Sequence, residues 1–359
     1  MASIRTLLAA FAICALSSPD TVAQQAPVWE PYRTSAPQTV AHPELVSAGG
    51  GVPFEVVTDS DLQEMCAACD DPFSGQCVPH CVTTPVYTNA PYGDPVLAPL
   101  TDAPVWRWHL LPDDVIWHSY WAGAQEPRLS GAVFEETQDN VSLLDVSLGG
   151  RTSVLRYGTV NQGRPEGWEL QLEGAGMLRL NLDYNWDLDA VDFRFGIPLI
   201  YGQGCSQWKF SYYHLSSHLG DEILIRGDKV LADRINFSRD VLVLAYSFFP
   251  VPALRLYGEM GWAFYADEGT EPWEFQFGID YAQPGPTGSR GTPFFAVNGH
   301  LREELNYGGN FVAQAGWLWR GNGGKVLRTG LHYLNGKSNQ FEFYDQFEQQ
   351  IGLGLWYDY

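Results

Sequence analysis

Long apolar runs and basic residues are both scarce in this sequence. After the first 23 residues no segment holds 18 consecutive apolar residues, so the sequence predicts no membrane-spanning helix. Lys and Arg number 21 against 42 Asp and Glu, which gives a formal net charge of −21 at pH 7. Proteins that bind nucleic acid need basic patches to meet the phosphates. We therefore expect no nucleic-acid partner.

Cysteine is sparse as well, with six residues in 359. Four of them fall in the stretch CAACDDPFSGQCVPHC, namely Cys66, Cys69, Cys77 and Cys81. Their spacing suits either a tetrahedral zinc site, in which His80 can replace one thiolate, or two small disulfide bonds. An oxidising compartment favours the disulfides, and the sequence does not determine their pairing. Cys205 is left over by this count, and we expect its thiol to be free.

The first 23 residues are typical of a secretory signal peptide. Arg5 provides a basic start, residues 7–16 form an apolar run, and Thr21-Val22-Ala23 provides a small-residue cleavage site. Residues 24–104 are rich in Pro, Ala, Val and Thr and show little periodicity. We expect them to form a largely irregular, Cys-containing periplasmic segment, followed by a barrel domain at 105–359.

Aromatic residues are abundant: 13 Trp, 18 Tyr and 19 Phe make up 14% of the chain. The mean hydropathy is nevertheless only −0.17. A membrane β-barrel reconciles the two values, because each strand is apolar outward and polar inward while aromatic girdles accumulate at both interfaces. A secreted, aromatic-rich β-sandwich or carbohydrate-binding protein is the alternative.

From Arg128 onward the apolar residues recur at every second position. In WEFQFGIDY, for example, Trp273, Phe275 and Phe277 share one face, whereas Glu274 and Asp280 lie on the other. About 12 segments follow this pattern: 128–135, 141–159, 168–182, 188–200, 206–218, 231–249, 254–264, 273–281, 292–303, 309–320, 324–335 and 347–359.

Alternation over ten or more residues exceeds the usual soluble strand and matches a tilted membrane-spanning strand. A soluble barrel would turn the apolar face inward instead. The signal peptide, the strand number and the terminal Tyr359, which resembles the assembly signal of bacterial outer-membrane barrels, favour the membrane. The sequence thus predicts an all-β, transmembrane antiparallel β-barrel of about 12 strands in the outer membrane, with its N-terminal segment in the periplasm.

The link lengths suggest an orientation for this barrel. If both barrel ends lie in the periplasm, the short links 250–253 and 320–324 are periplasmic and the longer link 336–345 is external. The link at 283–292 is long for its side.

The stretch YYHLSSHLGDE, residues 212–222, carries the candidate chemistry. His214 and Ser216 fall on one face of the strand, with Cα atoms roughly 6.5–7 Å apart, a separation that two reaching side chains can bridge. A serine needs a base and the base needs a third group to orient it. Asn236 on the following strand is our candidate for that group. Alternatively, these residues only mark the polar end of the strand, and a third interpretation, a metal site of His214, His218 and Glu222, suits a helix better than a strand.

Here the residues resemble outer-membrane phospholipase A, a 12-stranded barrel with a His-x-Ser pair on one strand and Asn on the next; lipid A deacylases also use a His-x-Ser pair. The resemblance covers only about 25 residues. The phospholipase's Asn-Gly after the serine is Ser217-His218 here, and its calcium ligands have no clear counterpart. The nearby carboxylates, which are weak metal candidates, are Asp221, Glu222 and Asp228.

A wider resemblance covers nearly all of residues 106–359. The stretches WRWHLLPDDVIWHSYWAGAQEPRLSG (106–131), YYHLSSHLGDE and FYDQFEQQIGLGLWYDY look like an uncharacterised bacterial family, the domain of unknown function 1207. This resemblance implies an exported barrel and assigns no reaction. Residues near LPDD and YWAGAQEPR form either a plug or a linker packed at the rim.

Two functions remain open. The first is a structural or small-solute role without a cofactor, with a narrow, mostly filled lumen lined by Glu259, Glu274, Asp280, Arg194 and Arg320. The alternative is a serine lipid hydrolase of the phospholipase or lipid A deacylase type, with calcium as a cofactor. Membrane lipids, and the barrel-assembly machinery through the C-terminal strand, are the expected partners.

Overall fold

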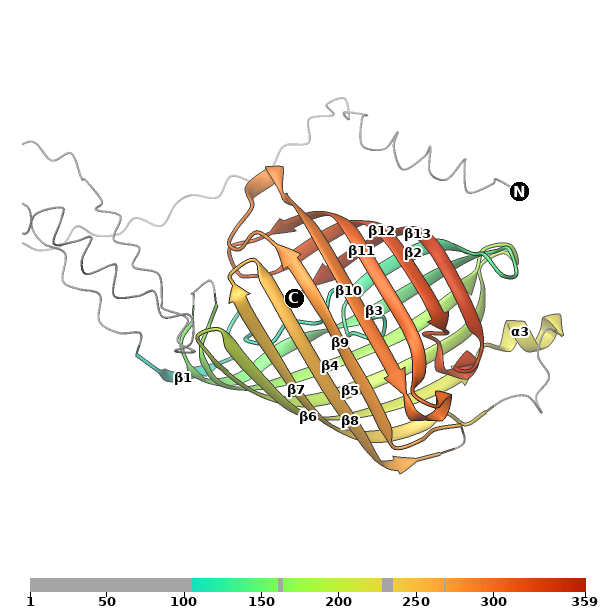
Figure 1. The fold of residues 1–359 in the computed structure, drawn as a ribbon, viewed down its shortest axis with the longest axis horizontal. Helices are drawn as coiled ribbons and strands as arrows, with labels where there is room; N and C mark the ends of the chain where they lie inside the picture. The colour runs from blue at the N-terminus through green and yellow to red at the C-terminus, as the bar shows by residue number, and fades with distance from the viewer. Residues whose placement is uncertain (1–104, 161–163, 228–234, 268) are drawn as a thin grey trace, which may run out of the picture. The chain divides into compact units, whose positions relative to one another are not determined.

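The computed structural model describes residues 105–160, 164–227, 235–267 and 269–359. The predicted signal peptide, the segment 24–104 with its four clustered cysteines, and Asp228 lie outside these ranges. In the described part, 13 antiparallel strands build one sheet (Figure 1). Their bounds are β1 Arg107–Leu110, β2 Leu129–Glu136, β3 Val141–Gly158, β4 Gly167–Asn181, β5 Asp187–Gln203, β6 Ser206–Leu219, β7 Ser238–Val251, β8 Leu254–Ala266, β9 Trp273–Ala282, β10 Thr292–Arg302, β11 Gly308–Arg320, β12 Val326–Lys337 and β13 Phe347–Asp358.

Strands β2–β13 close into a barrel. Each pairs with its neighbour in the sequence, and β13 pairs with β2 from Gln350↔Glu136 to Tyr357↔Leu129. This closure confirms the predicted all-β barrel of 12 strands. The short strand β1, which the sequence did not predict, pairs with the end of β3 beyond the reach of β2. We call the barrel end at which β2 begins and β13 ends the lower rim, and the opposite end the upper rim.

The two faces of the wall differ sharply in polarity. On β9, Phe277 points outward and is 50% exposed, whereas Glu274 and Asp280 face the lumen and are buried. Four arginines are among the largest fully buried side chains, namely Arg156, Arg239, Arg302 and Arg328. A barrel stable in water would bury its apolar face instead. The outer wall therefore suits lipid acyl chains, and the barrel is of the transmembrane kind.

Aromatic side chains follow one row across neighbouring strands near the lower rim. Trp108 pairs with Tyr157, Tyr157 with Trp168, and Trp168 with Tyr201; the row continues through Trp208 to Tyr246. Trp and Tyr favour the interface between lipid and water, where the ring is buried and the polar atom is hydrated. Strand β1 extends this row by one residue, Trp108.

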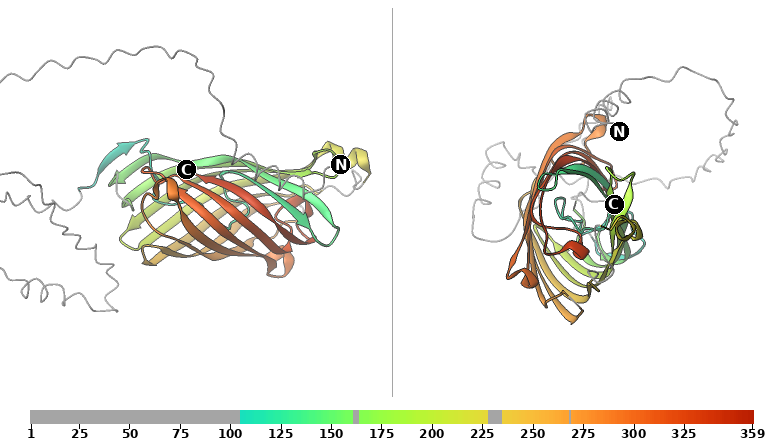
Figure 2. Two further views of the ribbon diagram at one scale, coloured as in Figure 1. Left: turned by 90° about the horizontal axis from the view of Figure 1, so that it is seen from above. Right: turned by 90° about the vertical axis from the view of Figure 1, so that its right-hand side faces the viewer.

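Between β1 and β2 the chain leaves the wall and folds into the lumen. We call residues 111–128 the plug; Figure 2 (right) shows chain inside the ring of strands at this point. Trp117, Tyr120 and Ala122 have no exposed surface. Of the two arrangements open at the sequence level, the structure therefore contains the plug and not a linker packed at the rim.

Wall side chains satisfy the backbone of the plug. The carboxylate of Glu169 accepts a hydrogen bond from Ile116 N at 2.9 Å, and Gln207 Nε2 donates to Ile116 O at 2.8 Å. Arg255 Nη1 donates to His118 O at 3.0 Å. Buried backbone groups need such partners, so the charged lumen is explained by the irregular chain that it holds.

The links agree with the expected pattern. Residues 252–253 and 321–325 connect strands at the lower rim and 338–346 at the upper rim, while 283–291 is again long for the lower rim. The link after β6 carries α3 (Asp221–Arg226), and η2 (Gly288–Arg290), η3 (Glu303–Leu305) and η4 (Phe341–Phe343) are short 3-10 turns. None of these described helices is long and apolar enough to cross a bilayer. Cys205 is disulfide-bonded, so the expectation that its thiol is free is wrong.

Candidate functional site

The candidate site lies on the outer wall of β6 and β7, close to the upper rim. Along β6, Tyr213, Leu215 and Ser217 are buried toward the lumen, whereas His214 and Ser216 alternate with them on the outside. Ser216 stands three residues before the end of β6, about 10 Å along the strand. The pair therefore lies near the level at which the apolar wall gives way to the polar rim.

His214 is held by a carboxylate on the neighbouring strand. The register of β6 and β7 sets His214 directly opposite Asp240, and His214 Nδ1 lies 2.9 Å from Asp240 Oδ1. Tyr212 donates its hydroxyl hydrogen to the same carboxylate oxygen at 2.7 Å. With Nδ1 engaged, the imidazole presents Nε2 as the nitrogen that can take a proton, the tautomer that a Ser-His-Asp arrangement uses.

Ser216 lies two positions further along β6, opposite Ser238 of β7. No hydrogen bond between Ser216 and His214 is present among the described residues. In catalytic sites without substrate such bonds are often long and tighten only when the substrate binds. The structure therefore brings His214 and Asp240 into contact and places Ser216, the candidate nucleophile, two residues from His214 on the same face.

Asn236 does not reach His214. Asn236 lies two residues before β7 begins, and its side-chain amide donates instead to Asp267 Oδ2 at 2.6 Å. Asp240, and not the predicted Asn236, is the residue that contacts His214. The sequence did hold a signal for Asp240: it is a carboxylate on the same alternate positions as the outward-facing Leu242 and Leu244. The register across the link at 220–237 was needed to see that it faces His214.

The surroundings of the pair on the lipid side are aromatic and aliphatic. Phe195 of β5 pairs with His214, and Phe193 pairs with Ser216. Towards the barrel middle, Tyr212 pairs with Leu242, and Leu242 pairs with Trp262 of β8. An acyl chain lying against this wall would therefore meet a continuous apolar surface that ends at Ser216 and His214.

The metal candidates are not assembled into a site. Asp221 and Glu222 are exposed in the first turn of α3, and Asp228 lies outside the described residues. Within the described ranges, no cluster of three or more His, Cys, Asp or Glu side chains could hold a metal ion.

The five lumen residues named from the sequence all occur in polar contacts inside or at the end of the barrel. Glu259 pairs with Lys209 at 2.6 Å and accepts the Tyr120 hydroxyl at 2.7 Å. Glu274 contacts His300 at 3.0 Å, Asp280 accepts Trp121 N at 3.2 Å, and Arg194 lies 3.6 Å from Glu173. Arg320 donates to the carbonyl oxygen of Gln283 at the lower rim. Two cavities among the lumen side chains measure only about 20 and 50 Å³, so plug and side chains fill these parts of the lumen.

Comparison with known proteins supplies one family and two solved structures. The family model described as "Protein of unknown function (DUF1207)" matches residues 101–359, in agreement with the resemblance noted in the sequence. The calcium-bound dimer of Salmonella typhi outer membrane phospholipase is 10% identical, with a TM-score of 0.43, and the match covers 65% of this chain and 91% of that one. Escherichia coli outer membrane phospholipase A is also 10% identical, with a TM-score of 0.41, and the match covers 65% of this chain and 91% of that one. No curated protein matches the sequence.

Proposed function

This chain belongs to the DUF1207 family of proteins of unknown function, and we propose that it is an outer-membrane barrel whose outer wall carries a serine lipid hydrolase. In this proposal Ser216 is the nucleophile, His214 the general base and Asp240 the group that orients the base. The observation that carries the proposal is the 2.9 Å contact between His214 Nδ1 and Asp240 Oδ1 on a lipid-facing wall, two residues from Ser216.

The arrangement supports acyl transfer to serine. As Ser216 Oγ bonds to the carbonyl carbon of an ester, its proton passes to His214 Nε2, and Asp240 stabilises the imidazolium through Nδ1–H. Collapse of the tetrahedral intermediate breaks the ester bond, and the leaving alcohol takes the proton from Nε2. Water then attacks the acyl-serine with His214 again as base, and a fatty acid leaves.

The position of the pair supports a lipid as the substrate. The ester bonds of membrane lipids lie at the boundary between headgroups and chains, and Ser216 stands where the apolar wall ends near the upper rim. Calcium remains a candidate cofactor of this reaction, with Asp221, Glu222 and Asp228 as the carboxylates nearest in sequence.

Fatty-acid release tests the proposal. Purified barrel in detergent micelles is supplied with phospholipid, lipid A and the micellar ester p-nitrophenyl palmitate, with calcium or with EDTA. Release by the unaltered chain, and none by Ser216→Ala, is the expected result. Equal release by both proteins would remove the serine from the reaction.

A second candidate, a structural barrel without transport or catalysis, is favoured by a different observation. Plug residues Trp117, Tyr120 and Ala122 have no exposed surface in the lumen, which argues against free passage of solutes. Recording in a planar bilayer tests this structural role against a small-solute role. A silent barrel supports a structural role, whereas stable conductance steps support a small-solute role.

The cellular address is part of the same proposal. The apolar outer wall and the predicted signal peptide support insertion in the outer membrane, with barrel-assembly machinery as a partner of the C-terminal strand and residues 24–104 in the periplasm. Fractionation of cells, with protease added outside or after the outer membrane is opened, tests both the membrane and the side.

A further inference from the structure

The barrel wall has a break beside β3. Strand β2 pairs with residues 141–148 of β3, and β1 pairs with residues 155–158. Residues 149–153 pair with β4 on one side, but no described strand lies on their other side. The break exists because the chain leaves the wall after β1 to form the plug and returns to it only at β2.

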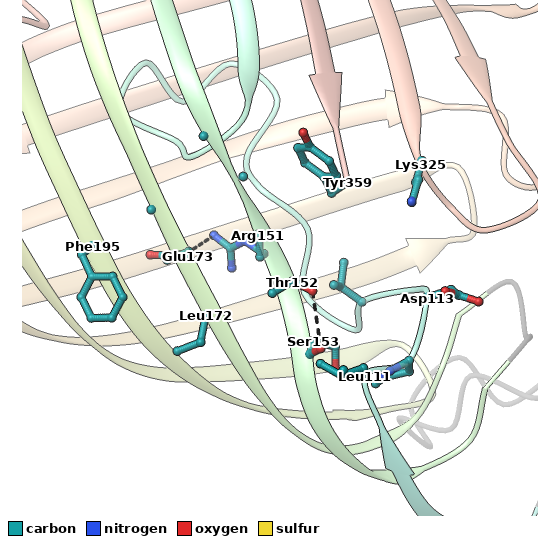
Figure 3. A pocket seen from close by; sticks show the side chains of 15 residues that line it. Leu111, Asp113, Arg151, Thr152, Ser153, Leu172, Glu173, Phe195, Lys325 and Tyr359 are labelled. Atoms are coloured by element: carbon teal, nitrogen blue, oxygen red, sulfur yellow. Dashed lines mark hydrogen bonds and ion pairs between the residues drawn. The ribbon is translucent and has the colours of Figure 1, made fainter.

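A cavity of about 570 Å³ lies at this break (Figure 3). Its volume is within the range of roughly 300–1,000 Å³ that small-molecule sites have. Tyr359, after β13, and Lys325, in the link between β11 and β12, line it together with residues of β3. Both belong to the lower rim. The cavity therefore opens through the wall at the end where the strands meet lipid headgroups.

Buried hydrogen-bond donors in the lining lack partners. Ser153 Oγ and Arg151 Nε are both buried and have no hydrogen-bond partner among the described residues. Alternate residues of the unpaired edge 149–153 also direct N–H and C=O groups to the break. Such groups are costly to leave unsatisfied beside lipid.

The charges in the lining are of both signs. Glu173 and Glu126 neutralise the guanidinium of Arg151, so Arg151 offers a ligand a hydrogen-bond donor but no uncompensated positive charge. Lys325 and Asp113 are both exposed, and neither has an ion pair with a described residue. The lining thus offers one ammonium group and one carboxylate to a ligand.

The lipid side of the lining is apolar. Leu172 of β4 and Phe195 of β5 point outward and are partly exposed. Figure 3 shows them on the side of β3 opposite Tyr359 and Lys325. A ligand in the break therefore meets polar groups along β3 and the plug, and an apolar surface along β4 and β5.

We propose that this cavity binds the headgroup of one zwitterionic glycerophospholipid that carries a primary ammonium group. The phosphate accepts hydrogen bonds from Lys325, Ser153 and the unpaired edge of β3, and the ammonium group pairs with Asp113. The acyl chains follow Leu172 and Phe195 into the bilayer. Ligand and wall then complement each other in charge, hydrogen bonding and polarity, and the site needs no hydrolysis at Ser216.

Isothermal titration of the delipidated barrel in detergent tests the site. The probes are dihexanoyl phosphatidylethanolamine, dihexanoyl phosphatidylglycerol, glycerophosphoethanolamine and inorganic phosphate. Ser216→Ala serves as background so that hydrolysis cannot alter the probes. We expect one equivalent of the ethanolamine lipid to bind at least tenfold more tightly than the other three.

Three substitutions separate the contacts. Lys325→Ala should weaken binding of the ethanolamine lipid about tenfold, because a charge-assisted contact is lost. Arg290 is an exposed basic residue in another lower-rim link, and Arg290→Ala should leave the affinity unchanged. Asp113→Asn should abolish the preference over phosphatidylglycerol.

The outcomes are decisive in either direction. If Arg290→Ala weakens binding as much as Lys325→Ala, the lipid is held only by the general positive charge of the rim and not by this cavity. If Asp113→Asn keeps its preference for the ethanolamine lipid over phosphatidylglycerol, the zwitterionic assignment is wrong. Tight binding of inorganic phosphate alone would replace the lipid by a free anion, and no saturable binding of any probe would remove the site.

Discussion

Tyr120 of the plug stacks on Tyr257 of β8, with ring centroids 3.8 Å apart and ring planes within 9° of each other. The same Tyr120 donates its hydroxyl hydrogen to Glu259 on β8 at 2.7 Å. Tyr120 therefore contacts the apolar cluster of the lumen through Tyr257 and the ion pair of Lys209 and Glu259 through its hydroxyl. The plug belongs to the core of this barrel, and a change in it should be felt by the whole domain.

Tyr120→Ala should lower the free energy of unfolding by roughly 3–5 kcal/mol, because it removes a fully buried ring and leaves a cavity. Heat-induced mobility shift in detergent, or urea unfolding into micelles, measures the loss. Tyr281→Ala on the lipid-facing side of β9 is the control, and a smaller loss is expected there. Equal losses would mean that the plug contributes nothing particular to stability.

Ser216→Ala should abolish fatty-acid release without changing stability, since the side chain is partly exposed and unbonded in the described structure. The matched control is Ser217→Ala, the next residue, whose hydroxyl faces the lumen and donates to Asp192. That variant should lose some stability and keep its activity. Activity lost only in Ser217→Ala would place the chemistry inside the barrel.

Asp240→Asn should reduce kcat about 10³-fold or more while KM changes little, because an amide oxygen and nitrogen cannot hold the required imidazole tautomer as a carboxylate does. Asn236→Ala should cost less than about threefold, since Asn236 contacts Asp267 and not His214. Steady-state rates on p-nitrophenyl palmitate measure both, and Asp240→Glu should restore part of the rate. The reverse ranking would return the orienting role to Asn236.

The lowered pKa of His118 predicts that the stability of the plug depends on pH. Burial, and next the Arg255 guanidinium, lower the pKa of His118 from 6.5 to about 3. Between these values the unfolded chain carries a proton that the folded chain lacks, so stability falls as the pH drops below 6.5, by up to ~1.4 kcal/mol per pH unit. Thermal unfolding from pH 7 to 4 should therefore be less pH-dependent in His118→Gln than in the unaltered chain. Parallel curves for the two proteins would contradict this.

Phe277→Lys should destabilise the barrel in lipid by about 2–4 kcal/mol, because it places a charge on the lipid-facing wall. Ser289→Lys, at an exposed position of a lower-rim link, should change stability by less than about 0.5 kcal/mol. Folding yield and urea stability in phospholipid vesicles report the difference. A harmless Phe277→Lys would show that this face does not contact acyl chains.

The agreement between predicted and observed strands is closest where alternation is strict. The segment 254–264 became β8 and 273–281 became β9, because a period of two assigns every side chain to one of two faces without knowledge of its neighbours. Strand β7 begins at Ser238, whereas the alternating pattern had predicted a start near 231. The short β1 was missed because four residues are too few to show a period.

By itself, the sequence predicted about 12 strands, the side chains that share each face of a strand, and the common face of His214 and Ser216, because these depend only on residues near each other in the chain. Tertiary structure alone decided that Asp240 meets His214 and that residues 111–128 fill the lumen. Both depend on pairing between distant segments: register is set across an 18-residue link, and the plug is held by wall side chains such as Glu169, Gln207 and Arg255. Local periodicity contains no information about such pairings, because they are fixed only when the barrel closes.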